Sequence, residues 1–189
     1  KGQESIIAIG ASTGGTVALR EVLIPLPEDM PGIVIVQHMP KAFTPSFSES
    51  LDRECQLTVH EAREGEPVER GKVLISPGDQ HMMLKPNGDG YSVSMSSGEL
   101  VNRHRPSVDV LFRSVANVAG AKATVVILTG MGDDGAKGLA EMHGTGSHTF
   151  AQDEESCVVF GMPRAAFESG GVDEVLNPEQ IVRRLIKLR

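Results

Sequence analysis

Three residues with the side chains of a serine-type catalytic site are spread along the chain, and glycines surround the first and the last. Ser12 lies in Gly-Ala-Ser-Thr-Gly-Gly at 10–15, His38 in Gln-His-Met-Pro, and Asp134 is the second acid of Gly-Met-Gly-Asp-Asp-Gly. Nucleophilic catalysis by serine needs an attacking hydroxyl, a base that takes its proton and a carboxylate that fixes the tautomer of the base. The pattern predicts an acyl-hydrolase site with Ser12 as nucleophile, His38 as general base and Asp134 as the group that orients the histidine.

The glycines around Ser12 favour a sharp turn from a strand into a helix. Residues 10–14 match the pattern G-x-S-x-G, and a helix start offers free N–H groups near a developing negative charge. We expect the N–H group of Thr13 to be an oxyanion donor. Glycine turns of this kind also bind phosphate, so a non-catalytic nucleotide- or phosphate-binding module is the alternative. The dinucleotide fingerprint, however, requires glycine where Ser12 stands, and His38 occupies the region of its acidic residue.

Other residues compete for the roles of His38 and Asp134. Asp133 precedes Asp134, and paired acids also serve as structural charges at a helix N-terminus, so the residue pattern leaves both aspartates open. A metal site built from histidines and these aspartates lacks the H-x-x-x-H, H-x-H or C-x-x-C spacing of metal ligands, and we expect none. The rival bases are His60, His81 and His104, of which His81 and His104 could instead line the rim of the site.

Short β-branched runs alternate with amphipathic segments along the chain. The apolar runs are 6–9, 33–36, 73–75 and 124–128, and helical spacing covers 17–23, 45–51, 108–118, 136–142 and the segment after Asn177. Runs that are apolar on both faces are typical of central parallel strands, which the helices would cover. We therefore predict a doubly wound, mostly parallel α/β sheet with a small antiparallel hairpin within the Gly- and Pro-rich stretch 65–98. Loops at the carboxyl ends of such strands form the ligand crevice, which would gather the three candidate residues.

The composition favours one globular domain over residues 1–189. The chain has 189 residues and a net charge of −7, and a chain of this length buries a sizeable core without disulfides. Its two cysteines are too few for a disulfide framework, and the first apolar run is too short for a signal peptide or a membrane span. We expect a cytoplasmic protein. The acidic balance argues against a nucleic-acid partner, because neutralising phosphates needs a basic face.

The ordered set of motifs resembles the catalytic domain of the CheB-type chemotaxis protein-glutamate methylesterases. Further matching segments are Ser76-Pro77-Gly78, Arg105-Pro106-Ser107-Val108-Asp109 and Cys157-Val158-Val159-Phe160-Gly161-Met162-Pro163-Arg164, so the resemblance covers nearly the whole chain. It implies a three-layer α/β/α sheet and a cofactor-free esterase that removes methyl groups from chemoreceptor glutamates, releases methanol and also deamidates glutamines. The family's catalytic residues fall on Ser12, His38 and Asp134. Its active-site methionine falls on Met131, whose backbone would supply a second oxyanion donor.

The resemblance also implies partners. The substrate would be the long bundle of cytoplasmic helices of a methyl-accepting chemoreceptor, so the rim of the site must contact a protein, without direct membrane insertion. Arg103 and Arg105 are candidates for contacts with acidic residues beside the target glutamate. The amino-terminal phospho-receiver domain that normally restrains the esterase is absent from this chain, which we interpret as a fragment or a stand-alone member. A receptor-like system outside chemotaxis is a further alternative. The stretch 144–150 is more polar than the strand expected there.

Overall fold

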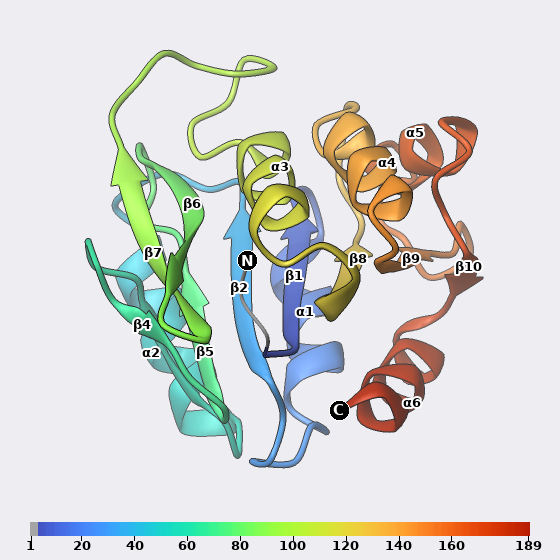
Figure 1. Ribbon diagram of the computed structural model, residues 1–189. Helices are drawn as coiled ribbons and strands as arrows, with labels where there is room; N and C mark the ends of the chain where they lie inside the picture. Colours follow the sequence, from blue (N-terminus) through green and yellow to red (C-terminus); the bar gives the residue numbers. More distant parts are fainter. Residues whose placement is uncertain (1–3) are drawn as a thin grey trace.

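A seven-stranded sheet runs through the centre of the computed structural model, which describes residues 4–189 (Figure 1). The strand order is β10-β9-β8-β1-β2-β5-β3, and every neighbouring pair is parallel. The strands are β1 (Ile6–Ala11), β2 (Gly32–Gln37), β3 (Thr58–Glu61), β5 (Lys72–Ile75), β8 (Ala123–Ile127), β9 (His148–Gln152) and β10 (Glu174–Leu176). The predicted parallel sheet is confirmed.

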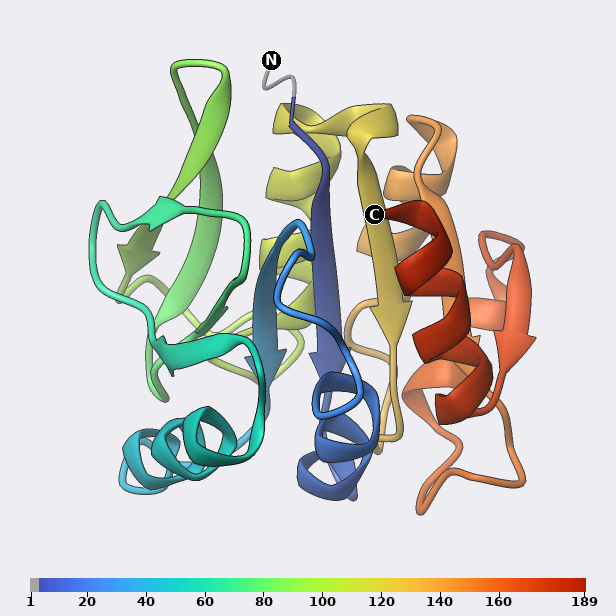
Figure 2. The same cartoon turned by 90° about the horizontal axis from the view of Figure 1, so that it is seen from below.

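Helices cover both faces of this sheet (Figures 1 and 2). Helices α1, α2 and α6 share one hydrophobic core with the sheet, and α3, α4 and α5 share the other. The helices are α1 (Gly15–Leu23), α2 (Thr44–Glu54), α3 (Val108–Val118), α4 (Ala136–Gly144), α5 (Met162–Glu168) and α6 (Pro178–Leu188), with a 3₁₀ turn at Gly120–Lys122. None of the helices within residues 4–189 is long and apolar enough to cross a membrane.

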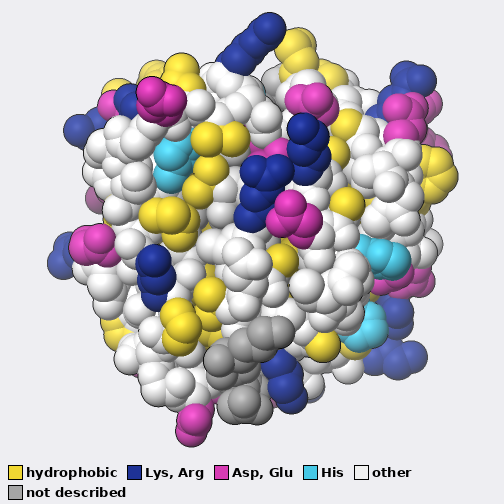
Figure 3. Space-filling model, turned by 45° about the horizontal axis from the view of Figure 1, so that its top comes forward, with side chains coloured by type: hydrophobic (Ala, Val, Ile, Leu, Met, Phe, Trp, Pro, Cys, Tyr) yellow, Lys and Arg dark blue, Asp and Glu magenta, His cyan; other side chains and the backbone are white. Residues whose placement is uncertain are grey.

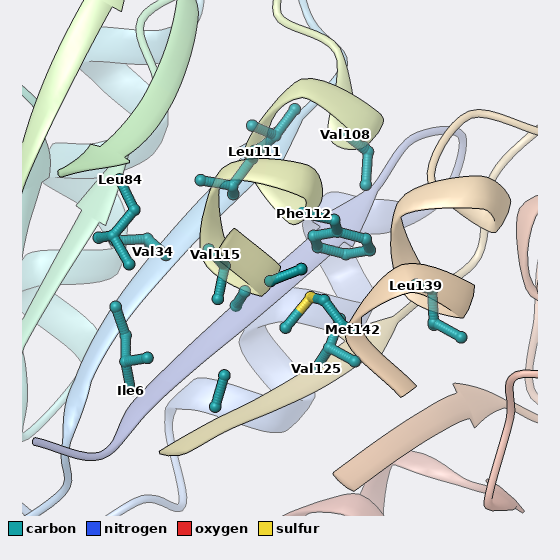
Figure 4. Packing of buried hydrophobic residues seen from close by; sticks show 14 of the residues in the cluster. Ile6, Val34, Leu84, Val108, Leu111, Phe112, Val115, Val125, Leu139 and Met142 are labelled. Carbon is teal, nitrogen blue, oxygen red and sulfur yellow. The ribbon is translucent and has the colours of Figure 1, made fainter. Parts of the chain in front are cut away.

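The alternation of side chains along β1 explains why its sequence is apolar throughout. Ile6 and Ala8 point into the core under α3, whereas Ile7 and Ile9 point into the core under α1. Each face is therefore buried, as expected for a central parallel strand. The larger core side chains of α3 are Val108, Leu111, Phe112 and Val115, which lie over Ile6, Val34 and Val125 of the sheet (Figure 4).

A second, antiparallel sheet is formed in the region where the sequence predicts a hairpin. It consists of β4 (Pro67–Val68), β6 (His81–Asn87) and β7 (Gly90–Ser96), in the order β4-β7-β6. Strands β6 and β7 pair from His81↔Ser96 to Asn87↔Gly90. Gly88 begins the two-residue turn between them with a φ of 60°, a conformation that glycine adopts without a steric penalty. This sheet packs into the core that α3 shares, through Leu84, Tyr91 and Val93.

The centre of the parallel sheet is a topological switch point. From β1 the chain forms β2, then the edge strand β3, and then β5 between them, and it later adds β8, β9 and β10 in turn on the opposite side of β1. The loops that follow β1 and β8 lead to α1 and α4 on opposite faces of the sheet. In open α/β sheets, ligands bind at the carboxyl ends of the strands at such a switch point.

The polar stretch 144–150 still contributes a strand. Strand β9 begins at His148 and pairs with β8 from Thr124↔His148 to Ile127↔Ala151. Within β9, only His148 is exposed. Thr149 is buried, and its hydroxyl donates to the carbonyl of Gly171. A polar residue is therefore compatible with this buried strand, because the hydroxyl group of Thr149 is hydrogen-bonded.

Candidate active site

Ser12 and His38 are brought together by the register of two neighbouring strands. Ala11 is paired with Gln37 at the carboxyl ends of β1 and β2, and the N–H of His38 donates to the carbonyl oxygen of Ala11 at 3.0 Å. The Gln37 amide then donates to the carbonyl oxygens of both Ser12 (2.9 Å) and His38 (3.1 Å). The two loops are therefore fixed to each other where the strands end.

A direct hydrogen bond joins His38 to Asp134. The Nε2 atom of His38 lies 2.7 Å from Oδ2 of Asp134, and only 8% and 1% of the two side chains are exposed. An ionised carboxylate only accepts hydrogen bonds, so Nε2 carries the proton and Nδ1 carries the lone pair. Nδ1 is buried and makes no hydrogen bond within the described chain. It is therefore the nitrogen that can accept a proton.

The carboxylate of Asp134 accepts an unusually complete set of hydrogen bonds. The donors are His38 Nε2, Asn102 Nδ2 (2.8 Å), Ser107 Oγ (2.8 Å) and the N–H groups of Val108 (2.7 Å) and Asp109 (3.1 Å). Burial raises the pKa of Asp134, but the hydrogen bonds from His38, Asn102 and the backbone outweigh it and lower the pKa to about 2. Asp134 is therefore ionised at neutral pH and able to stabilise a charged imidazole.

The N-terminus of α3 supplies much of this environment. Ser107 is the N-cap residue and accepts from the N–H of Val110, while the free N–H groups of the first turn point at Asp134. A helix N-terminus carries a partial positive charge, which favours a carboxylate at this place. The apolar face of α3 is packed in the core, and this packing fixes the position of the helix N-terminus that binds Asp134.

The loop after β1 forms a tight turn around Ser12. The N–H of Ser12 donates to the carbonyl of Thr129 at 2.9 Å, and the N–H of Gly15 donates to the carbonyl of Ser12 at 2.7 Å. The N–H of Thr13 makes no hydrogen bond in residues 4–189, so it is available to an oxyanion. Because the N–H groups of Ser12 and Gly15 already donate to backbone carbonyls, the turn has fewer free donors than a typical phosphate-binding loop.

The loop after β8 approaches Ser12 closely. A Cβ atom at Gly130 would lie 2.8 Å from Cβ of Ser12, so only glycine fits there. Met131 follows, with 64% of its side chain exposed and no partner for its N–H among the described residues. The hydroxyl of Thr129 donates to the carbonyl of Thr13 and ties this loop to the Ser12 turn. Thr13 and Met131 are thus both placed beside the serine, with free N–H groups.

The two aspartates differ sharply in their surroundings. Asp133 is exposed, whereas Asp134 is buried and bonded to His38. Of the two aspartates that the sequence leaves open, the structure brings Asp134 into contact with His38.

The two arginines have different places. Arg105 donates to Oδ1 of Asp79 from Nε (3.1 Å) and Nη2 (2.6 Å), and Nη1 donates to carbonyl oxygens of Ser97 and Gly98. Its guanidinium therefore braces two loops. Arg103 is exposed and makes no side-chain hydrogen bond within the described residues.

Of the three rival histidines, one belongs to the site. His60 pairs with Glu66 at the far edge of the sheet. His81 is buried, with Nε2 on the carbonyl of Glu99 and Nδ1 accepting from the N–H of Ser107, so both nitrogens are used by the backbone. The ring of His104, in contrast, stacks on that of His38.

Sequence reasoning missed the residues that hold the candidate triad in place. Gln37, Asn102 and Ser107 bond directly to the loops or side chains of the site. The signal for Ser107 was available, because a serine directly before an apolar helical segment is a typical N-cap. Nothing in the residue pattern indicates the contact between Asn102 and Asp134, since the two are 32 positions apart.

The fold and the site together define a class of protein. A doubly wound α/β sheet that gathers serine, histidine and a buried aspartate at its switch point is the arrangement of a serine-type hydrolase. The CheB methylesterase family matches residues 7–185, and the chain belongs to this family. The resemblance inferred from the motifs is therefore confirmed.

Similar proteins agree with this assignment. The chain is 60% identical over 178 residues (94% of this chain and 50% of the relative) to protein-glutamate methylesterase/protein-glutamine glutaminase 2 of Dechloromonas aromatica. It is 58% identical over 183 residues (97% and 52%) to the enzyme of the same description from Yersinia pestis. The crystal structure of the Thermotoga maritima CheB methylesterase catalytic domain superimposes with a TM-score of 0.95 at 42% identity, covering 98% of this chain and 99% of that one. The chain thus spans about half the length of the curated relatives it matches.

Proposed function

We propose that this chain hydrolyses methyl esters of glutamate residues on the cytoplasmic helices of chemoreceptors, releasing methanol, and also deamidates receptor glutamines. The observation that carries the proposal is the buried His38–Asp134 pair, in which His38 Nδ1 has no hydrogen-bond partner within the described chain and the N–H of His38 donates to Ala11, the residue before Ser12. The curated relatives bear the name of this double activity. Esters and primary amides share one tetrahedral intermediate, so a single serine site serves both.

The proposed reaction has two halves. The Oγ of Ser12 attacks the glutamyl carbonyl while His38 Nδ1 takes its proton, and Asp134 stabilises the imidazolium. The N–H groups of Thr13 and Met131 stabilise the oxyanion. The imidazolium then protonates the leaving methoxide, and methanol departs from the glutamyl-serine ester. Water, deprotonated by Nδ1, attacks this ester and restores Ser12. With a glutamine substrate, ammonia leaves instead of methanol.

Ser12 Oγ makes no hydrogen bond to His38 in the described structure. Catalytic hydrogen bonds are often long in substrate-free enzymes and shorten in the reacting complex. A change in the side-chain torsion of Ser12 is enough to alter the position of its oxygen, because the backbone turn is fixed by the bonds to Thr129 and Gly15.

The direct experiment is methanol release from methylated chemoreceptor membranes by the purified chain, with Ser12→Ala as the matched control. We expect release by the wild type and its loss, by a factor on the order of 10³ or more, in the variant. No release by folded wild type would reject the chemoreceptor substrate. Stabilisation by nucleotides together with indifference to Ser12→Ala would instead support a phosphate-binding module.

The receptor contact is proposed for the rim of the site. Figure 3 looks toward the carboxyl edge of the sheet, where basic and acidic side chains lie close together with apolar ones between them. Arg103 is exposed and unpaired in the described chain, whereas Arg105 is bound to Asp79. Arg103→Ala should therefore impair hydrolysis of receptor more than hydrolysis of a small activated ester. Arg105→Ala should impair hydrolysis of both substrates, because the loops that Arg105 joins would lose order. A loss confined to receptor in Arg105→Ala, together with equal losses on both substrates in Arg103→Ala, would reject these separate roles.

Control by a phospho-receiver domain is part of the same proposal. If such a domain restrains the site in the full-length protein, the present chain should hydrolyse receptor esters faster than the unphosphorylated full-length form. Equal rates for the chain and for both phosphorylation states of the full-length form would reject this restraint.

A further inference from the structure

The segment Val101–His104 is a tight turn that lies over the candidate catalytic pair. Val101 and His104 exchange two backbone hydrogen bonds of 2.9 Å each. The two residues between them, Asn102 and Arg103, have φ angles of 53° and 68°. This is the left-handed region, which asparagine adopts fairly readily but arginine rarely does, and such residues persist where the surrounding structure demands them. The turn therefore carries a conformational cost that points to a role.

One side chain of the turn contacts the candidate base. The ring of His104 stacks on the ring of His38 with 3.7 Å between centroids and 9° between planes. The side chain of His104 makes no hydrogen bond within residues 4–189, so its ring contacts His38 by stacking alone. A ring held against another ring at this distance prevents the His38 imidazole from tilting or turning out of plane.

The other side chain contacts the candidate orienting acid. The Nδ2 atom of Asn102 lies 2.8 Å from Oδ1 of Asp134 and 2.6 Å from Oδ2 of Asp109. Asp109 is buried and accepts from the N–H of Gly138 at 2.7 Å, which fixes it to the start of α4. The Asn102 amide is therefore a bridge between the acid that holds His38 and a second acid anchored in the scaffold.

We infer that Asn102 and His104 are positioning residues for the reaction: the turn holds the plane of the His38 imidazole and the carboxylate of Asp134, so that Nε2 stays bonded to the acid and Nδ1 keeps its lone pair. This inference rests on the proposed hydrolytic function. Neither residue needs to touch the reacting atoms, and each acts through one member of the His38–Asp134 pair.

The charge state of His104 suits this role. The charged or titratable groups that bear on it are His38, Asp134 and Asp133. Burial and then the charge of His38 lower the pKa of His104, and the two aspartates oppose this shift. A neutral aromatic face beside the imidazolium that forms on His38 is favourable, whereas a second cation there would repel it. The stacking partner must therefore be aromatic and uncharged, which phenylalanine also satisfies.

The test compares His104→Ala with His104→Phe, and His143→Ala is the control on the exposed surface of α4. Hydrolysis of a small activated ester gives kcat and KM. Separately, ¹⁵N shifts of the His38 ring, recorded in a Ser12→Ala background, report which nitrogen carries the proton. We expect His104→Ala to lower kcat about tenfold or more with little change in KM, because misplacement of a catalytic group mainly affects the chemical step. The His38 ring should also lose its Nε2–H preference. His104→Phe should restore both properties.

A second variant isolates the Asn102 amide. Asn102→Gly keeps a residue that readily adopts positive φ, so the turn is retained while the bridge to Asp134 is lost. We expect a lower kcat with unchanged far-ultraviolet circular dichroism. Unchanged kcat and unchanged ring shifts in both His104→Ala and Asn102→Gly would overturn the inference, as would equal damage by phenylalanine and alanine at His104. A wild type without hydrolysis would instead reject the proposed function, while the ring shifts would still test the positioning.

Discussion

The buried carboxylate of Asp134 is the best-defined feature of the candidate site. Its carboxylate is 1% exposed and receives hydrogen bonds from a ring, an amide, a hydroxyl and two backbone N–H groups. Burying a charge is costly unless it is paired and hydrogen-bonded, and here both conditions are met. The result is a fixed negative charge that holds His38 in one tautomer.

The first prediction separates the two neighbouring acids. Asp134→Asn should lower kcat by about 10²-fold or more, since an amide cannot stabilise the imidazolium and can itself donate to Nε2, which favours the wrong tautomer. Asp133→Asn should leave kcat nearly unchanged, because Asp133 is exposed. Initial rates on a small ester measure both. A damaging Asp133→Asn combined with a silent Asp134→Asn would show that the orienting acid is misassigned.

The second prediction concerns acid stability. The pKa of Asp134 falls from the ordinary value of 3.8 to about 2 on folding, so its ionised form stabilises the fold above about pH 4. That contribution is lost as the pH falls through about 2 and amounts to on the order of 2 kcal/mol. Urea unfolding of wild type and Asp134→Asn should therefore give free-energy curves that converge between about pH 4 and pH 2. Parallel curves over this range would contradict the lowered pKa.

At the scale of elements, the N-terminus of α3 links the core to the site. Its N-cap hydroxyl, on Ser107, both accepts from the first turn and donates to Asp134. The apolar face of the same helix is buried against β1 and β8 through Val108 and Phe112. Helix packing therefore determines where the carboxylate is held.

A pair of cap substitutions tests this link. Ser107→Ala and Asn177→Ala each remove a helix N-cap and should each lower the free energy of unfolding by about 1 kcal/mol. Only Ser107→Ala should also lower kcat, because Asn177 caps α6 with Gln180 in a capping box away from the loops of the site. Urea unfolding and ester hydrolysis of both variants provide the comparison. Equal effects on kcat would mean that the cap acts through stability alone.

The elements that sequence reasoning could find are those with an unambiguous pattern. Strands β1, β2 and β8 are buried on both faces, and α6 begins with the capping sequence Asn-Pro-Glu-Gln. Strand β10 was missed because it is three residues long and only partly buried. Strand β3 was missed because it is a polar edge strand of four residues.

The same contrast applies to the site. The three candidate catalytic residues follow apolar strands, so the geometry of a parallel sheet predicts their common edge. Asn102 and His104 belong to a loop between the small sheet and α3, and no periodicity places that loop against His38 and Asp134. Their contacts with Asp134 and His38 come from tertiary packing, which only the structure provides.

At the scale of the whole molecule, one sheet separates two cores, and the small antiparallel sheet joins one of them. Tyr91 of β7 is 2% exposed, lies in the core that α3 shares, and donates from its hydroxyl to the carbonyl of Glu4 at 2.6 Å. The small sheet is thus packed continuously with the α/β layers. Because β1 contributes side chains to both cores, disruption of the packing on one face of the sheet would also expose the apolar side chains on the other face.

This continuity predicts a single cooperative unfolding transition. The chain has one tyrosine and no tryptophan, so its intrinsic fluorescence reports on the small sheet alone. Circular dichroism at far-ultraviolet wavelengths reports mainly on the six helices. Urea transitions followed by the two signals should coincide, as expected for a two-state domain. A tyrosine transition at lower urea concentration would show that the antiparallel sheet unfolds separately.

The central claim is that Ser12 and His38 act as one unit, and a double-mutant cycle measures this most directly. Ester hydrolysis by Ser12→Ala, His38→Ala and the double variant should be compared with that of wild type at one pH. Each single change should cost on the order of 10³-fold in kcat, and the double variant should be no worse than either, because a base without its nucleophile has nothing to activate. Losses that multiply in the double variant, or an active Ser12→Ala enzyme, would contradict the account.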